Sequence, residues 1–229
     1  MFTALLDFLF PPRCPGCKDY TESLGQWCPA CEEEYLAPKL FMDVDSPIEA
    51  VLCLAPYDGA VRELLHRLKF RRDEGAVPYL HQLIKRCWEA ADESAIGGDA
   101  ERFRNYLGDD PLFVPVALHP AREKERGFNQ AVLIWRDFLT GWGYQWLEPL
   151  ERTRETLPQY TLNKKEREEN VQGAFGLRQG YAEQLAFRTV VLVDDIYTTG
   201  ATMNACADAL KKAGPKRILA ITLASGRNL

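Results

Sequence analysis

The sequence predicts an α/β protein, in which helices cover both faces of a parallel sheet and a small four-cysteine module precedes that sheet. Short apolar runs alternate with amphipathic helical patterns between residues 51 and 223, an order typical of parallel strands joined by right-handed crossovers. Residues 190–193 are all apolar, which is typical of a strand buried on both faces. Two Cys-x-x-C motifs lie near the start. We therefore expect an N-terminal helix with a Cys₄ zinc module at residues 1–46 and the α/β domain at residues 47–229.

The composition is that of an ordinary globular protein. With 229 residues, 46% of them hydrophobic and 27% charged, the chain can hold one sizeable α/β domain and a small appendage. The formal net charge of −5 does not indicate a nucleic-acid-binding protein, although it leaves local basic patches open.

The apolar residues at the start of the chain predict a short packing helix rather than a signal peptide. Asp7 interrupts this stretch, and no basic segment precedes it. The apolar positions that share one helical face are Phe2, Leu5, Leu6 and Leu9. No later apolar run approaches the roughly 20 residues that a membrane-spanning helix needs. We expect a cytoplasmic protein without membrane insertion, and the oligomeric state stays open.

Four of the seven cysteines form two close pairs that predict a structural zinc site. The pairs are Cys14 with Cys17 and Cys28 with Cys31. Each pair can place two thiolates on one ion, and two pairs complete the tetrahedral S₄ set that Zn²⁺ prefers. The alternatives are disulfides or a redox dithiol, but a redox Cys-x-x-C site needs one pair where a strand meets a helix. We interpret Cys53, Cys87 and Cys206, which stand in apolar segments, as buried thiols.

The hydrophobic periodicity predicts the order of the remaining elements. We expect strands at residues 51–55, 112–118, 190–193 and 217–223. We expect helices after residue 57 and at residues 77–91, 129–139 and 201–213. The segments between them are interpreted as a linker with a short initial helix at 32–47, an irregular surface excursion with a helical turn at 92–110, a basic loop at 119–130, and an exposed, mobile charged loop at 152–170.

The strongest functional signal is the segment Val-Val-Leu-Val-Asp-Asp-Ile-Tyr-Thr-Thr-Gly-Ala-Thr at residues 190–202. Asp194 and Asp195 follow a predicted strand at its carboxyl end, where open α/β sheets bind their ligands. Backbone N–H groups and hydroxyls at the start of the next helix can hold a phosphate. The phosphate-binding candidates are Tyr197, Thr198, Thr199, Gly200, Ala201 and Thr202. Helix caps would explain any one of these residues, but together they resemble the phosphoribosyl pyrophosphate (PRPP) motif of type I phosphoribosyltransferases.

Several further segments, in order along nearly the whole chain, resemble the ComF/GntX family of phosphoribosyltransferase-like proteins. The segments are the four-cysteine module, Tyr-Asp-Gly at 57–59, Leu-Lys-Phe at 68–70, Val-Pro-Val at 114–116, Arg-Gly-Phe-Asn-Gln at 126–130, Arg152 with Gln159, Arg167 and Asn170, Gly-Ala-Phe at 173–175, and the Asp-Asp segment. The chain departs from the family at Ala117 and Leu118, where a second Pro commonly follows Val-Pro-Val.

The resemblance implies a type I phosphoribosyltransferase-like sheet and assigns roles to particular residues. Asp194 and Asp195 would be the catalytic pair, which binds the ribose hydroxyls directly or through water on a Mg²⁺ ion that accompanies PRPP. Arg122 and Arg126 would lie in a loop near the pyrophosphate. A hood over the site would be formed by residues 152–170, with Arg152, Gln159, Arg167 and Asn170 as its candidate ligand contacts. His119 is interpreted as a turn residue rather than a general base.

Three functions are compatible with these patterns. The first is a PRPP-dependent phosphoribosyltransferase with an unknown acceptor, acting in nucleotide or nucleic-acid utilisation. The second, which the family resemblance implies, is a protein that helps to take up or use single-stranded DNA together with the DNA-uptake machinery. Basic residues at positions 62, 67, 69, 71 and 72 favour this alternative, and the acidic net charge disfavours it. The third is a regulator that binds PRPP without turnover.

Overall fold

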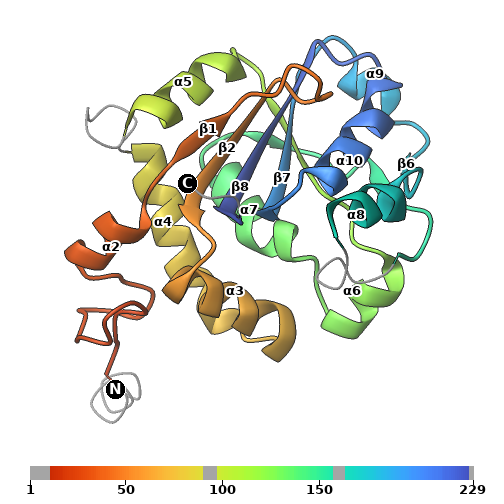
Figure 1. Cartoon of the computed structure of the whole chain (residues 1–229). Helices are drawn as coiled ribbons and strands as arrows, with labels where there is room; N and C mark the ends of the chain where they lie inside the picture. Colours follow the sequence, from red (N-terminus) through yellow and green to blue (C-terminus); the bar gives the residue numbers. More distant parts are fainter. Residues whose placement is uncertain (1–10, 90–96, 157–162, 227–229) are drawn as a thin grey trace.

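The computed structural model describes residues 11–89, 97–156 and 163–226, and its centre is a mixed sheet (Figure 1). The strand order across this sheet is β1-β2-β8-β7-β3-β4. All neighbouring strands run parallel except β1, which pairs antiparallel with β2 at one edge. The expected parallel sheet with helices on both faces is therefore confirmed, with one added antiparallel edge strand.

The strands are β1 (Lys39–Phe41), β2 (Ala50–Pro56), β3 (Leu112–Pro115), β4 (Gln145–Trp146), β5 (Leu150–Arg152), β6 (Phe175–Leu177), β7 (Thr189–Tyr197) and β8 (Arg217–Ser225). The helices are α2 (Pro29–Tyr35), α3 (Gly59–Arg71), α4 (Val77–Glu89), α5 (Gly97–Leu107), α6 (Pro120–Arg126), α7 (Gln130–Gly141), α8 (Lys164–Val171), α9 (Ala182–Leu185) and α10 (Ala201–Lys211), with a 3₁₀ turn at Glu74–Ala76.

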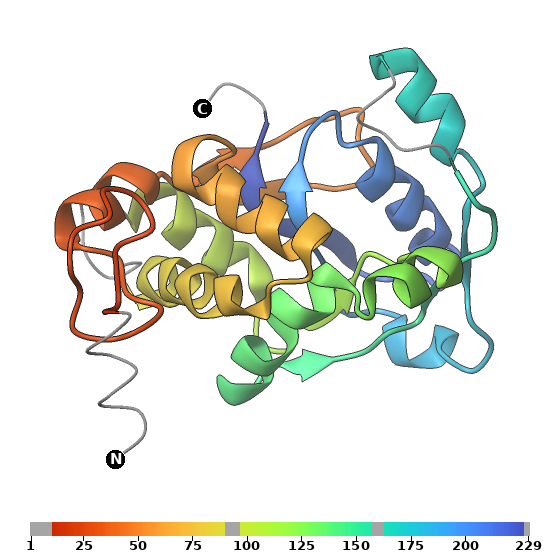
Figure 2. The ribbon, with the colours of Figure 1, turned by 90° about the horizontal axis from the view of Figure 1, so that it is seen from below.

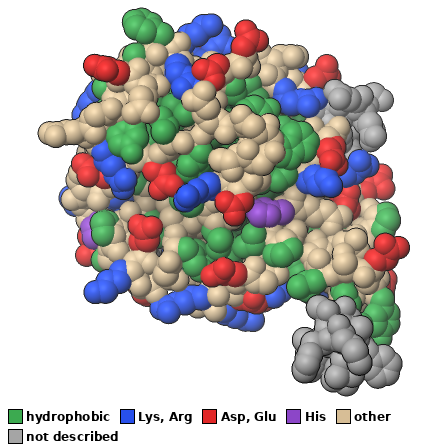
Figure 3. Space-filling model, turned by 180° about the vertical axis from the view of Figure 1, so that it is seen from behind, with side chains coloured by type: hydrophobic (Ala, Val, Ile, Leu, Met, Phe, Trp, Pro, Cys, Tyr) green, Lys and Arg blue, Asp and Glu red, His purple; other side chains and the backbone are tan. Residues whose placement is uncertain are grey.

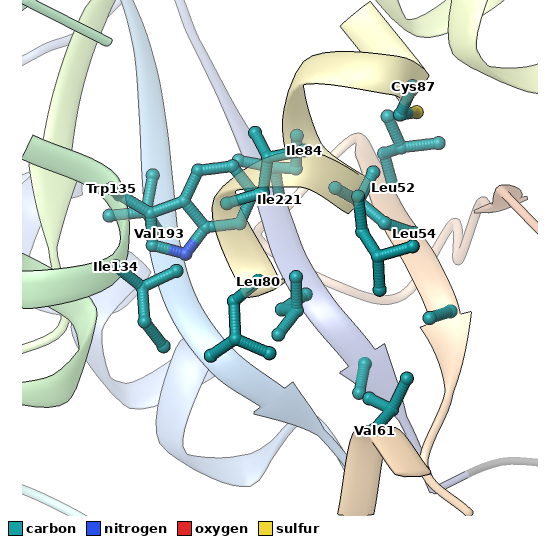
Figure 4. Packing of buried hydrophobic residues seen from close by; sticks show 14 of the residues in the cluster. Leu52, Leu54, Val61, Leu80, Ile84, Cys87, Ile134, Trp135, Val193 and Ile221 are labelled. Atoms are coloured by element: carbon teal, nitrogen blue, oxygen red, sulfur yellow. The ribbon is translucent and has the colours of Figure 1, made fainter. Parts of the chain in front are cut away.

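The central strand β7 contributes side chains to two separate hydrophobic cores, because its side chains alternate between the faces of the sheet. Val191 and Val193 pack with α3, α4, α5 and α7 on one face. Val190 and Leu192 pack with α10 on the other. Figure 4 shows the first of these cores, where Trp135 from α7 meets Val193 and side chains of α4. This alternation continues into the two acidic residues that follow and decides which face each one reaches.

Helix α4 confirms the clearest amphipathic pattern of the sequence. Its buried face includes Leu80, Leu83, Ile84, Cys87 and Trp88, as expected from their helical spacing. The expected helix after residue 57 and the helix at 201–213 are also confirmed, as α3 and α10.

Three expectations for the connecting segments are wrong. Residues 97–107, interpreted as mostly irregular, form the full helix α5. The expected basic loop contains the helix α6, which buries none of its residues. Pro120 is its first residue, and His119 Nδ1 caps it by accepting a hydrogen bond from Ala121 N at 3.2 Å. In the described part of the expected charged loop, Arg152 ends β5 and residues 164–170 belong to α8, whereas residues 157–162 lie outside the described ranges.

The four-cysteine segment packs directly on the α/β core. Cys14, Trp27 and Cys31 belong to the same buried cluster as the inner faces of α3 and α4. The indole Nε1 of Trp27 donates a hydrogen bond to Tyr79 O at 2.8 Å. The Tyr35 hydroxyl accepts one from Ala60 N, in the first turn of α3, at 3.3 Å. Figures 1 and 2 show this segment at the opposite side of the molecule from α6 and α8.

Two expectations fall on residues outside the described ranges. They are the apolar face of Phe2, Leu5, Leu6 and Leu9, and the position of Gln159. In the part of the chain that is described, no helix combines the length and the apolar character needed to cross a membrane.

Candidate functional site

The acidic pair lies inside β7 rather than after it, and the two side chains therefore leave the strand on opposite faces. Asp195 follows Val191 and Val193 at alternate positions along the strand and therefore points to the same face, toward the layer that contains α3. There its Oδ2 lies 2.7 Å from the Nζ of Lys69, and 8% of the Asp195 side chain is exposed. Asp194 lies on the same face as Val190 and Leu192 and points toward α10.

Asp194 accepts two hydrogen bonds and lies in an environment that disfavours the charged form of its carboxyl. Its carbonyl oxygen accepts a hydrogen bond from the Trp135 indole at 2.9 Å, and its Oδ1 accepts one from Asp195 N at 2.8 Å. Burial, and then the neighbouring negative charge of Asp195, raise the pKa of the Asp194 carboxyl to about 8. The Lys69 ammonium acts in the opposite direction.

The turn after β7 forms the first cavity of the site. Gly200 has a φ of 84°, a left-handed conformation that most residues avoid, and it precedes the first turn of α10. The N-terminus of α10 therefore opens toward a cavity of about 320 Å³. Its lining comprises Tyr57, Arg167, Asp194, Asp195, Ile196, Tyr197, Thr198, Gly200, Ala201, Thr202 and Met203. Thr199 is the one phosphate-binding candidate outside this lining, and its Oγ1 accepts a hydrogen bond from Ala201 N at 3.4 Å.

A second cavity of about 170 Å³ adjoins the first and is strongly basic. The two cavities share Asp194, Asp195 and Thr202 in their linings. The basic side chains that line the second cavity are Lys69, Arg122, Arg126 and Arg152. The acidic pair therefore separates a helix N-terminus on one side from a cluster of cations on the other.

The arginines of the second cavity are positioned by neighbouring polar groups. Arg122 Nη2 donates to Thr156 O at 3.0 Å, and Arg152 donates to the hydroxyl of the same threonine. Arg126 Nη1 donates to Gln130 Oε1 at 2.8 Å. Burial lowers the pKa of Arg126 and Arg152 from its usual high value. Both remain cations at neutral pH, because an arginine does not lose its proton in proteins.

The structure brings together only part of the predicted hood. Arg152 lines the second cavity from β5, and Arg167 lines the first cavity from α8. Asn170 contributes its carbonyl oxygen to a hydrogen bond from Arg154 at 3.0 Å and lines neither cavity. Helix α8 begins with a capping box, in which Asn163 and Glu166 each accept a hydrogen bond from the other's backbone N–H.

The residues at the site that were not assigned to it from the sequence include Lys69, Tyr57 and Trp135. Lys69 and Tyr57 lie within the Leu-Lys-Phe and Tyr-Asp-Gly segments that carry part of the family resemblance, so a weak signal for them existed. Trp135 was expected only as a core residue of its helix. Its hydrogen bond to a strand 59 residues further on could not be predicted from spacing.

The four-cysteine cluster fits a zinc ion. The Sγ atoms of Cys14, Cys17, Cys28 and Cys31 all lie within 4.8 Å of one another. The Sγ atoms of Cys17 and Cys28 are 3.6 Å apart, close to the edge of roughly 3.8 Å of a sulfur tetrahedron around Zn²⁺ with Zn–S bonds of about 2.3 Å. All seven cysteines are free thiols in the structure, so no disulfide competes. Within the described residues, no second group of three or more metal-binding side chains gathers in this way.

Comparisons with known proteins agree with both parts of this description. The family described as "Phosphoribosyl transferase domain" matches residues 156–228, which include the acidic pair and the turn. The family described as "Double zinc ribbon domain" matches residues 5–40 and supports a structural zinc site. Among solved structures, one of adenine phosphoribosyltransferase covers 84% of this chain and 89% of its own at 13% identity. Its TM-score of 0.38 is too low to support an inference.

Relatives along most of the chain are more informative. Competence protein F of Haemophilus influenzae is 35% identical and aligns over 90% of this chain and 82% of its own length. The DNA utilization protein YhgH of Escherichia coli K12 is 29% identical over 88% and 85% of the two chains. Competence protein ComFC of Streptococcus pneumoniae is 26% identical over 92% and 86%. The chain therefore belongs to the ComF family of competence protein F, with a phosphoribosyltransferase-type domain behind a zinc-ribbon segment.

Proposed function

We propose that the protein binds PRPP and transfers its phosphoribosyl group to an unidentified acceptor in nucleotide or nucleic-acid utilisation. One observation carries this proposal: two cavities meet at Asp194 and Asp195, and their linings differ in a way that suits the two ends of this ligand. The start of α10 would hold the 5-phosphate. The acidic pair would accept hydrogen bonds from the ribose hydroxyls, and the basic cavity would hold the diphosphate.

The proposed reaction is a displacement at the anomeric carbon of the ribose. The bond from this carbon to the diphosphate oxygen breaks, that oxygen keeps the electron pair, and a nucleophilic atom of the acceptor forms the new bond. Positive charge develops on the ribose and negative charge on the leaving group. Arg122, Arg126 and Arg152 would stabilise the departing diphosphate, and Asp194 and Asp195 would orient the sugar.

Mg²⁺ would add positive charge at the diphosphate when it is bound together with the ligand. The acidic pair offers oxygen ligands of the kind that this ion prefers. However, Lys69 already engages Asp195 at 2.7 Å, so protein oxygens alone form a poor Mg²⁺ site. We expect the phosphate and hydroxyl oxygens of PRPP to supply most of the ligands of this ion.

Calorimetric titration with PRPP in the presence of Mg²⁺ tests the binding step. The wild type should bind, and a double variant with Asp194→Asn and Asp195→Asn should lose at least about tenfold in affinity, because two acceptors of ribose hydroxyls are weakened. Asp208→Asn is the matched control, since Asp208 is an exposed acid on α10 that lines neither cavity. Absence of binding by the wild type would refute the proposal.

Turnover distinguishes a transferase from a regulator. Release of pyrophosphate should be assayed with PRPP and a panel of nucleobases and single-stranded oligonucleotides as acceptors. Release that depends on one acceptor supports the transferase. Tight binding without release across the panel favours a protein that senses PRPP.

A role with single-stranded DNA is the second candidate, because relatives along most of this chain are named competence and DNA utilization proteins. The exposed residues of α3 and of its C-cap include Arg62, Phe70, Arg71 and Arg72, a mixture of cations and an aromatic ring that suits a single strand. On the face shown in Figure 3, basic and acidic side chains are interspersed without a continuous basic stripe. Affinity for single-stranded DNA that does not fall as the salt concentration rises would count against this candidate.

A further inference from the structure

Lys69 lines the basic cavity and contacts Asp195, which both cavities share, and it comes from an element that carries none of the other cations of the site. It stands near the carboxyl end of α3, whereas Arg122 and Arg126 belong to α6 and Arg152 to β5. Its Nζ lies 2.7 Å from Asp195 Oδ2, and the same side chain lines the basic cavity. One ammonium group therefore faces both the acidic pair and the space proposed for the diphosphate.

The surroundings of Lys69 indicate that it is a fixed charge rather than a solvated surface lysine. Only 19% of its side chain is exposed. Lysine heads usually reach into water, and holding one at a half-buried position requires partners that compensate for its lost hydration. Asp195 engages one of the three N–H donors of the ammonium, which leaves donors for a ligand oxygen.

A cation in this place can do the work that a divalent ion does for a free diphosphate. PRPP carries several negative charges, and it needs positive charge between its diphosphate and the carboxylates that bind its ribose. Without such a charge, the carboxylate of Asp195 would repel the diphosphate. A lysine that lines the basic cavity and contacts Asp195 supplies this positive charge from within the protein.

We propose that Lys69 is a built-in bridging cation, which links Asp195 to the diphosphate of bound PRPP and makes binding depend only weakly on Mg²⁺. This inference rests on the proposed function, because it assumes that PRPP occupies both cavities. It adds a binding residue on α3 and a distinct metal dependence. A lysine that only pairs with Asp195 for stability would not change how strongly binding depends on Mg²⁺.

The test is PRPP titration with and without Mg²⁺ for four proteins: the wild type, Lys69→Met, Lys69→Arg and Arg71→Met. Mg²⁺ is withheld rather than chelated, because a chelator would also remove metal from the cysteine cluster. Arg71→Met is the matched control, because Arg71 is an exposed cation of the same helix whose partner is Glu63, at 3.5 Å. Thermal unfolding of each variant reports whether it is folded.

Withholding Mg²⁺ should weaken binding to the wild type, Lys69→Arg and Arg71→Met by less than about tenfold, and to Lys69→Met by at least about a hundredfold. Loss of wild-type binding without Mg²⁺, or an equal Mg²⁺ dependence of wild type and Lys69→Met, would overturn the inference and leave the proposed function intact. Absence of wild-type binding even with Mg²⁺ would overturn both. If Lys69→Met does not fold, the wild-type titration still tests the inference, because loss of wild-type binding without Mg²⁺ would overturn it.

Discussion

The indole of Trp135 donates a hydrogen bond to the carbonyl oxygen of Asp194 and thereby ties α7 to the end of the central strand. Trp135 is fully buried, and the hydrogen bond itself is partly buried. It fixes the backbone of the acidic pair from the face opposite α10. The orientation of the candidate site therefore depends on a core residue that touches neither cavity.

Trp135→Phe should destabilise the protein by about 2–3 kcal/mol, because it leaves a partly buried carbonyl without its donor and leaves space in the core beside it. Urea unfolding would measure the loss, and PRPP titration should show weaker binding by the folded variant. Trp142→Phe is the control, since Trp142 is 44% exposed at the end of the same helix. Equal stabilities of the two variants would contradict the role assigned to the hydrogen bond.

Stability should respond to pH through Asp194. The pKa of its carboxyl is about 8 in the folded protein and about 4 in the unfolded chain. Between these values the folded state keeps a proton that the unfolded state has lost, so this group makes the protein less stable as the pH rises from about 4 to about 8. Asp194→Asn removes the titration and keeps an oxygen that can accept from Asp195 N.

The check is urea unfolding of the wild type and Asp194→Asn at several pH values. The stability of the wild type relative to the variant should fall toward pH 8 and then level off. Titration of the cysteine cluster affects both proteins alike and cancels in the difference. A difference that stays constant with pH would show that Asp194 has an ordinary pKa.

Gly200→Ala should cost more than a matched change elsewhere. A methyl group at Gly200 would lie 2.9 Å from the Tyr197 hydroxyl oxygen, in addition to the strain of a φ of 84°. Gly143 has the same φ and no neighbour within 4 Å of its added carbon. We expect Gly143→Ala to cost about 1–2 kcal/mol from strain alone and Gly200→Ala about 1 kcal/mol more. Thermal unfolding of both variants separates the two contributions.

The zinc site predicts a fixed metal content. Purified protein should contain about one zinc per chain, and Cys14→Ser should lose it together with several kcal/mol of stability. Cys87→Ser should keep the metal, because Cys87 is buried in α4 outside the cluster. Metal analysis with thermal unfolding measures both effects. A folded Cys14→Ser protein with unchanged zinc would disprove the assignment.

The elements that sequence patterns predicted well are those with a buried face. Helix α4 repeats its apolar residues at the helical period, and the central strand begins with a continuous apolar run. Both are buried in the structure as expected. Helix α6 has no buried residue, so periodicity could not reveal it, and its caps decide its existence. The short strands β4, β5 and β6 have two or three residues each, too few to show a pattern.

The part of the candidate site that lies in one continuous segment could be predicted from the sequence. The contacts between residues far apart in the sequence could not. Asp194, Asp195 and the turn form one continuous segment, and the structure keeps them together around one cavity. Lys69 lies 126 residues before Asp195, so no local spacing could join them. The capping box that starts α8, by contrast, stands in the sequence as Asn163 followed by Glu166 and would have predicted that helix start.

We expect the contact between Tyr35 and the first turn of α3 to link the binding of zinc to the binding of the candidate ligand. Tyr35 belongs to the helix that follows Cys28, and α3 carries Lys69 at its other end. Zinc and PRPP would both bind the folded chain in preference to the unfolded one. Each would therefore lower the unfolded population, from which the other dissociates. Saturation with PRPP should slow the escape of zinc to a chelator, and removal of zinc should weaken PRPP binding at the far side of the molecule.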